Sequence, residues 1–181
     1  MHVALLRLLL VALLAVLLEN ISLAQAQVVA AEHPVMYLPL VTRELSDSAL
    51  SIAPYEQKVI DLTNKLRTEV GCPALTVSPE LAQVARAHSR DMAANNFFDH
   101  IGSDGSSSFQ RVQRAGYSYS MVAENIAAGF STPESVMLAW SQSPGHRSNL
   151  LNCALREIGV GYAFEAGSEM GHYWTQEFGT P

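Results

Sequence analysis

Residues 143–150 of the chain read SPGHRSNL, and three other short strings accompany them in a fixed order. FFDH lies before them at residues 97–100, AENIA lies before them at residues 123–127, and GHYWTQ follows at residues 171–176. Each string holds one side chain that can bind a metal ion or transfer a proton near neutral pH, in chain order His100, Glu124, His146 and His172. Because these side chains are far apart in the sequence, only a fold that gathers them would create a chemically capable cleft.

The order of apolar and capping residues predicts helices first and a β-hairpin last. Val59, Leu62 and Leu66 recur at helical spacing within residues 55–70. Capping patterns predict three further helices, which end near Asn95, Gly116 and Trp140 and have their N-caps at Ser78, Ser107 (with Gln110) and Ser131 (with Glu134). Alternating residues over 158–164 and 172–178, with a turn at 166–168, predict the hairpin. Helices followed by a hairpin indicate an α+β fold.

The four strings, ahead of a closing Glu177-Phe178-Gly179, resemble the CAP superfamily, also called the SCP domain. That superfamily includes cysteine-rich secretory proteins, antigen 5, plant pathogenesis-related proteins of class 1 and many bacterial members, and this chain is similar to the secreted bacterial type. The resemblance runs from about Tyr55 to Phe178 and includes NKLR at residues 64–67 and AHS at residues 87–89. It implies an α-β-α sandwich, in which helices flank a central antiparallel sheet.

The first residues are typical of an export signal. Arg7 precedes an apolar run from Leu8 to Leu18, and Ala24-Gln25-Ala26 supplies small residues for cleavage. The run is shorter than the ~20 residues that span a bilayer, so we expect cleavage and no integral membrane span afterwards. The predicted organisation is a signal peptide over residues 1–26, a flexible tether over 27–54 and one CAP domain over 55–181, in a protein that is secreted or held in the cell envelope.

Charge and cysteine content narrow the possible partners. The net charge is −6 and no Lys/Arg run is present, so nucleic acid is not an expected partner. Cys72 and Cys153 are the only two cysteines of a chain with a predicted export signal, which favours a structural disulfide. The alternative, a reactive or metal-binding thiol, needs a neighbouring base or a further soft ligand that the sequence does not indicate.

The resemblance implies that His100, Glu124 and His172 line a central cleft. It makes His100 and His172 the candidate ligands of a divalent metal such as zinc, and Glu124 the candidate catalytic residue beside metal-bound water. Where many relatives have a second cleft glutamate after the helix tryptophan, this chain has Ser143, and His146 is the side chain that could compensate. The loss of that glutamate weakens the expectation of a two-carboxylate acid/base mechanism.

Each candidate also has a structural interpretation. Glu124 could be an internal hydrogen-bonded strut, and His146 could fix a loop rather than bind a metal. Trp174 interrupts the Gly-His-Tyr-Thr-Gln string of many relatives, and a one-residue shift on a strand reverses the face, so His172 could point away from the cleft. His88 is expected to be a packed helix residue.

The sequence therefore leaves three functions open. The leading interpretation is a secreted binding module for a small apolar or envelope-derived ligand, with a cleft able to take a divalent ion. The first alternative is a metal-dependent hydrolase of peptide or envelope polymer, and the second is a structural or adhesive surface protein. Zinc-protease, nucleophile-elbow and phosphate-loop strings are absent from the sequence, so whether the protein is an enzyme stays open.

Overall fold

The computed structural model describes residues 53–181. The predicted signal peptide and almost all of the predicted tether lie outside the described residues. Within residues 53–181, no helix combines the length and the apolar character needed to cross a membrane.

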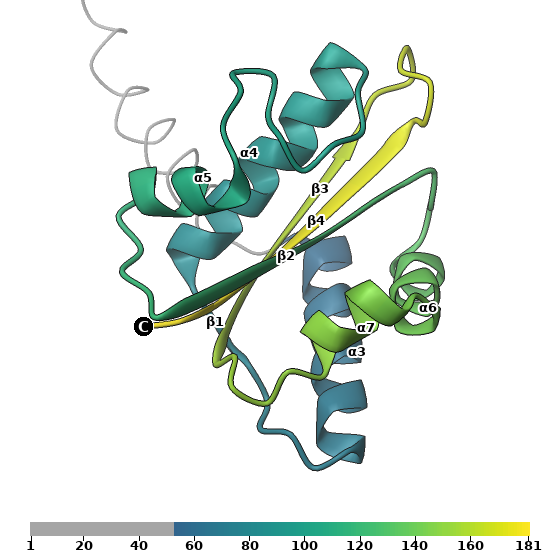
Figure 1. The fold of residues 1–181 in the computed structure, drawn as a ribbon. Helices are drawn as coiled ribbons and strands as arrows, with labels where there is room; N and C mark the ends of the chain where they lie inside the picture. The colour runs from purple at the N-terminus through teal and green to yellow at the C-terminus, as the bar shows by residue number, and fades with distance from the viewer. Residues whose placement is uncertain (1–52) are drawn as a thin grey trace, which may run out of the picture. The chain divides into compact units, whose positions relative to one another are not determined.

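A four-stranded sheet forms the centre of the domain (Figure 1). The strands are β1 (Thr76–Val77), β2 (Met121–Ala128), β3 (Glu157–Phe164) and β4 (His172–Thr180), in the spatial order β1-β3-β4-β2. The pairs β2–β4 and β3–β4 are antiparallel, whereas the two-residue β1 runs parallel to β3. The sheet is therefore mixed at one edge rather than wholly antiparallel as predicted.

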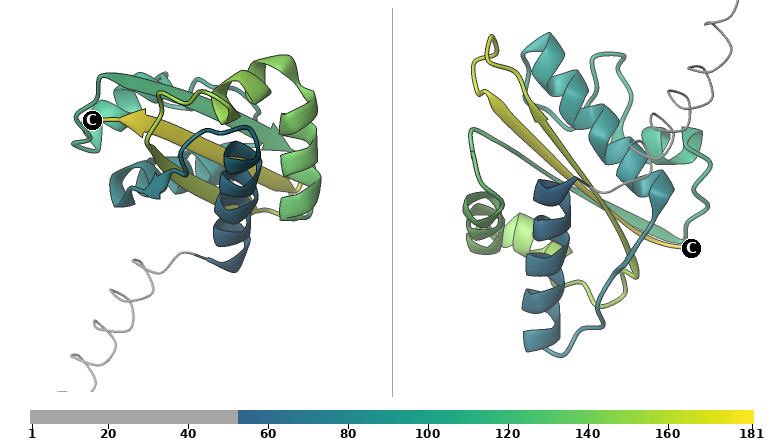
Figure 2. Two further views of the ribbon diagram at one scale, coloured as in Figure 1. Left: turned by 90° about the horizontal axis from the view of Figure 1, so that it is seen from below. Right: turned by 180° about the vertical axis from the view of Figure 1, so that it is seen from behind.

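Helices cover both faces of this sheet. The helices are α3 (Pro54–Glu69), α4 (Pro79–Asn95), α5 (Ser108–Arg114), α6 (Pro133–Gln142) and α7 (Pro144–Leu150). Figures 1 and 2 show α4 and α5 on one face and α3, α6 and α7 on the other. The α-β-α sandwich and the α+β class predicted from the sequence are confirmed.

Two of the three N-caps predicted from the sequence are observed, and the third is corrected by one residue. The Ser78 side chain accepts a hydrogen bond from Leu81 N, and Ser107 forms the predicted capping box with Gln110. The predicted Ser131 cap is wrong, because Thr132 is the N-cap of α6 and pairs with Ser135. Pro133 is the first residue of α6, and a proline favours that first position, so the cap is the residue directly before it.

Two glycines let α4 approach β3 closely. A Cβ atom on Gly159 would lie 2.1 Å from Ala82 N, and one on Gly161 would lie 2.2 Å from Ala85 C. Side chains at these two positions would push the helix away from the sheet. The close contact fixes the height of α4 above the sheet, and α4 carries His88 toward the site described below.

The opposite face holds the larger apolar core. Trp140, Trp174 and Phe178 are completely or almost completely buried there, and Tyr55 of α3 stacks on Trp174 with 6.1 Å between ring centroids. Each large apolar side chain buried in this way contributes roughly 1.5–3 kcal/mol relative to exposure.

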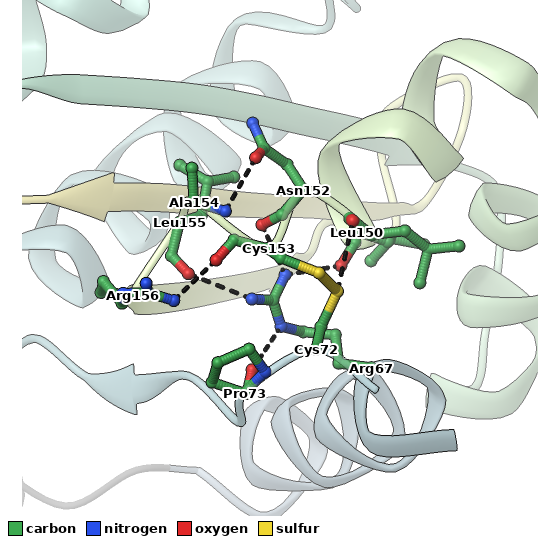
Figure 3. Close-up of a disulfide and its surroundings, with 10 residues drawn as sticks. Arg67, Cys72, Pro73, Leu150, Asn152, Cys153, Ala154, Leu155 and Arg156 are labelled. Carbon is green, nitrogen blue, oxygen red and sulfur yellow. Dashed lines mark hydrogen bonds between the residues drawn. A yellow bond between two sulfur atoms is a disulfide. The ribbon is translucent and has the colours of Figure 1, made fainter. Parts of the chain in front are cut away.

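A disulfide and a buried arginine join the connections at one end of this face (Figure 3). Cys72 and Cys153 are bonded, as predicted, across 81 residues of sequence. Beside them the fully buried Arg67 donates four hydrogen bonds of 2.8–3.0 Å to backbone carbonyls, those of Pro73, Leu150, Asn152 and Leu155. The guanidinium therefore satisfies backbone carbonyls before β1 and before β3 that would otherwise be buried without partners.

Candidate functional site

The site lies along β2, an outer strand of the sheet. Gly129 N donates to His172 O at 2.8 Å, so the odd-numbered residues of β2 form the hydrogen bonds to β4. The even-numbered residues, including Glu124 and Ile126, direct their backbone groups outward. The Glu124 side chain faces α4 and α5, because side chains alternate along a strand and Glu124 is paired with Glu177 on that face.

Glu124 is a buried carboxylate with two charge-assisted hydrogen bonds. His100 Nδ1 donates to its Oε1 at 2.6 Å, and Arg111 Nη2 donates to its Oε2 at 2.6 Å. The Glu124 side chain is 3% exposed, whereas the His100 side chain is 54% exposed. Burial alone would raise the pKa of Glu124, but the hydrogen bonds from His100 and Glu177 outweigh burial and the pKa is lowered.

Arg111 holds the loop that carries His100 against the sheet. Its Nη1 donates to the backbone carbonyls of His100 and Ser106, both at 2.9 Å. One guanidinium thus bonds both Glu124 and the backbone of the residue that contacts Glu124. The hydrogen bond to Glu124 raises the pKa of His100, so this imidazole is more readily protonated than a free histidine.

His88 lies beneath this group and is neutral. Its Nε2 donates to Asp99 O at 3.0 Å and lies 4.0 Å from Glu124 Oε2. Burial lowers the pKa of His88 in spite of the nearby carboxylate, so the 4.0 Å contact is not an ion pair near neutral pH. The expectation of a packed helix histidine agrees with its 1% exposure.

Helix α7 holds the other side of β2. Asn149 Nδ2 donates to Glu124 O at 3.2 Å and to Asn125 Oδ1 at 2.9 Å, and Asn125 Nδ2 donates to His146 O at 3.3 Å. Trp140 Nε1 donates to the outward carbonyl of Ile126 at 3.0 Å. The strings SPGHRSNL and AENIA are therefore joined by side chain to backbone hydrogen bonds, and His146 belongs to a helix rather than a loop.

A pocket of about 260 Å³ opens beside the last residues of β2. Its walls are mainly apolar, with two polar residues, and comprise Phe98, Ile126, Ala127, Ala128, Phe130, Ala139, Trp140, Ser143, His146 and Met170. Burial, and then the positive charge of His100, lower the pKa of His146. Ile126 lines the pocket and lies two residues after Glu124 on β2, so the pocket is beside the Glu124 group.

The structure gathers four of the five predicted cleft residues at this edge and leaves one apart. His100 and Glu124 are bonded, and Ser143 and His146 line the adjacent pocket. His172 faces the opposite side of the sheet, because it is an odd number of residues from Glu177 on the same regular strand. There its Nδ1 lies 2.8 Å from the Tyr162 hydroxyl, and its ring packs on Phe164.

This placement bears on the predicted zinc ligands. His100 and His172 do not meet, and the carboxylate next to His100 is already paired with Arg111. No cluster of three or more His, Cys, Asp or Glu side chains suited to a metal ion occurs within residues 53–181. The residues as arranged do not form the two-histidine site, and metal binding stays a prediction to be measured.

Sequence reasoning missed Arg111, Asn149 and Glu177. Asn149 was visible inside the SPGHRSNL string, and Arg111 lay at a helix position that usually faces solvent. The signal for Glu177 was its place in an alternating strand, on the face opposite His172 and Trp174. A charged residue between buried neighbours on a central strand indicates a polar interior contact.

An α-β-α sandwich with a histidine–glutamate pair at an outer strand defines the class of protein. The model of the CAP family, described as the cysteine-rich secretory protein family, matches residues 60–178, and the chain belongs to this family. The Bacillus subtilis protein YkwD is 42% identical over 137 residues, which are 76% of this chain and 51% of YkwD.

Solved structures agree with this assignment. An extracellular SCP-domain protein of Bacillus anthracis has 31% identity and a TM-score of 0.63, covering 72% of this chain and 45% of that chain. An outer surface protein of Borrelia burgdorferi has 22% identity and a TM-score of 0.62, covering 67% of this chain and 89% of that chain, and shows likeness of fold alone. The chain thus spans about half the length of YkwD and of the Bacillus anthracis protein.

Proposed function

We propose that this domain is an exported binding module that holds a small, largely apolar, envelope-derived ligand in the pocket beside β2. The observation that carries the proposal is the pocket itself, whose apolar walls end in two polar residues, Ser143 and His146. Ligand pockets usually combine apolar walls with a few polar groups that orient the ligand. At about 260 Å³ the pocket suits a small ligand or one segment of a larger one.

The neighbouring charges support a ligand with a polar end. His100 is exposed beside the pocket, and its hydrogen bond to Glu124 favours the protonated imidazole. A ligand whose apolar part fills the pocket could therefore place an acceptor group near His100 or His146. The name of the Bacillus anthracis relative, an extracellular protein, supports export of the domain and so contact with envelope material.

Filling the pocket tests this proposal. Ala139 lines the pocket, whereas its neighbour Leu138 on the same helix is 57% exposed and does not line it. We expect Ala139→Phe to weaken binding of the dye 1-anilinonaphthalene-8-sulfonate, which joins apolar rings to an anionic sulfonate, by about tenfold or more, equivalent to 1.4 kcal/mol. The matched control Leu138→Phe should bind like the natural protein.

Melting curves of both variants would confirm that each is folded, and displacement of the dye by muropeptide fragments would test the envelope origin of the ligand. Equal dye binding in the two variants, or no saturable binding to the natural protein, would contradict the pocket proposal. Absence of both binding and turnover would favour the structural or adhesive role.

Hydrolysis of peptide or envelope polymer, with a divalent ion, is the second candidate function. The specific observation in its favour is the His100–Glu124 pair, in which the carboxylate fixes the proton on Nδ1. The other ring nitrogen of His100 has no partner within residues 53–181, and in the neutral imidazole it could accept a proton from water.

Cell-wall polymer digested with and without zinc would test this candidate. Zinc-dependent turnover that is lost in Glu124→Gln and His100→Gln would support it. No turnover by the natural protein in zinc would remove it, without affecting the binding proposal.

A further inference from the structure

Two carboxyl groups face each other on adjacent strands at the base of the site. Glu124 of β2 and Glu177 of β4 are direct cross-strand partners. The backbone of Glu124 points outward, so the two form a non-hydrogen-bonded pair, in which Cα atoms are usually about 4.5 Å apart and side chains are closest. Like charges directly opposite each other in this way destabilise a sheet.

The positive charges beside the pair bond one of its two carboxyl groups, that of Glu124, and leave the other without a bonded cation within the described part of the chain. Glu177 is completely buried, and its carboxyl accepts hydrogen bonds from the Ser108 hydroxyl at 2.9 and 3.2 Å. Arg111 bonds Glu124, and no bond from Arg111 to Glu177 is present. On β3 the residue opposite Glu177 is Gly159, which carries no side chain.

The remaining titratable neighbours do not change this balance. His100 bonds Oε1 of Glu124, and His88 of α4 is neutral because burial lowers its pKa. Burial, followed by the negative charge of Glu124, raises the pKa of Glu177 well above its ordinary value. The proton is therefore expected on Glu177, whereas Glu124 bonds the cations.

We propose that Glu177 is a positioning residue of the cleft: it remains a neutral carboxylic acid and donates its proton in a hydrogen bond to Glu124. That hydrogen bond keeps Glu124 an anion directed at His100 and Arg111. The chain thus has a carboxyl pair after all, with its second member on β4 instead of at Ser143. This inference goes beyond the binding proposal and does not depend on which ligand fills the pocket.

The test follows individual glutamate carboxyl groups in the ligand-free protein. With glutamate labelled by ¹³C at the side-chain carboxyl, NMR spectra recorded as the pH rises from acid should show one carboxyl that remains protonated after the others have ionised. This signal should disappear in Glu177→Gln and persist in the control Glu165→Gln, which alters an exposed glutamate.

A second signal separates positioning from mere packing. The side-chain amide introduced by Glu177→Gln can donate to Glu124 as the acid does, so the His100 Nδ1 proton should stay bonded and visible. In Glu177→Leu, which lacks a donor, that proton signal should shift or broaden.

Three results would overturn the proposal. These are ionisation of every glutamate near the ordinary value of about 4.3, persistence of the late-ionising signal in Glu177→Gln, and loss of the His100 proton in Glu177→Gln. If Glu177→Leu does not fold, the first two results still decide the matter. Failure of dye binding would overturn the pocket proposal and leave these signals unchanged.

Discussion

On the face covered by α3, α6 and α7 the sheet packs Trp174 and Phe178 into an apolar core, whereas on the face covered by α4 and α5 it buries Glu177 and Thr175. The first face gains free energy from apolar area removed from water. The second buries polar groups, and each of these requires a partner to offset its lost hydration. The buried carboxyl groups of the site therefore lie on the second face, whereas the larger apolar core lies on the first.

The largest expected effect on unfolding free energy comes from removing the Cys72–Cys153 disulfide on the apolar side. In the chain-entropy model, opening a loop that spans 81 residues costs up to about 4.5 kcal/mol. We expect the double variant Cys72→Ala, Cys153→Ala to lose up to this amount of unfolding free energy in urea titrations. Unchanged stability would mean that the core and Arg67 alone hold this end of the domain.

The next effect tests close packing on the polar side. Gly161→Ala places a Cβ about 2.2 Å from Ala85 C, so α4 must move, and we expect a loss of about 3 kcal/mol or more, or failure to fold. Gly145→Ala on α7 is the matched control, because a Cβ there meets nothing within 4 Å. Similar melting temperatures for both variants would show that α4 can shift without cost.

A third prediction uses pH to measure the buried carboxyl pair. Because the folded pKa of Glu177 is raised, its stabilising contribution is complete below the unfolded value near 4.3 and is lost as pH rises toward the folded pKa. Relative to Glu177→Gln, the natural protein should therefore lose up to about 1.4 kcal/mol of unfolding free energy per pH unit in that window.

Urea titrations of the two proteins at several pH values between 5 and 8 would measure this difference. The histidine contributions should be similar in both proteins and cancel. Parallel stability profiles would argue that Glu177 ionises in the folded state as it does in the unfolded chain.

The smallest effect is expected at His172. His172→Phe removes the hydrogen bond with the Tyr162 hydroxyl but keeps ring contact with Phe164, so a loss of about 1 kcal/mol is expected from thermal unfolding. Calorimetric titration with zinc should show that any binding at the cleft survives this change and is lost in His100→Ala. Equal loss of zinc affinity in both variants would instead show that the two histidines converge, as the sequence analysis predicted.

The sequence predicted most elements of the fold because their signals are local. Ser78 and the Ser107–Gln110 pair begin helices through hydrogen bonds to residues at most three positions away. Strand β2 was not predicted, since Ala123, Asn125 and Ala127 are weak strand formers. Its extended conformation depends on pairing with β4, which lies about fifty residues later in the chain.

The sequence predicted only those parts of the site that short local strings encode. His100, Glu124 and His146 were found by resemblance, and their short strings carry that information. Glu177 and Arg111 act through contacts with Glu124 across 53 and 13 positions of sequence, which no local pattern encodes. The face of His172 depended on strand register, and the intervening Trp174 made that register ambiguous until β4 was seen paired with both neighbours.

The hydrogen bonds on the outer side of β2 also affect how copies of the protein meet each other. An exposed strand edge is a template on which a second molecule can add a strand, and repeated addition produces fibres. Here the outward carbonyls of Glu124 and Ile126 already accept from Asn149 and Trp140, and the opposite edge strand β1 is only two residues long. The contacts that shape the cleft therefore occupy carbonyl groups that a strand of a neighbouring copy would need for hydrogen bonds. We expect the domain to resist polymerisation through its sheet edges at high concentration.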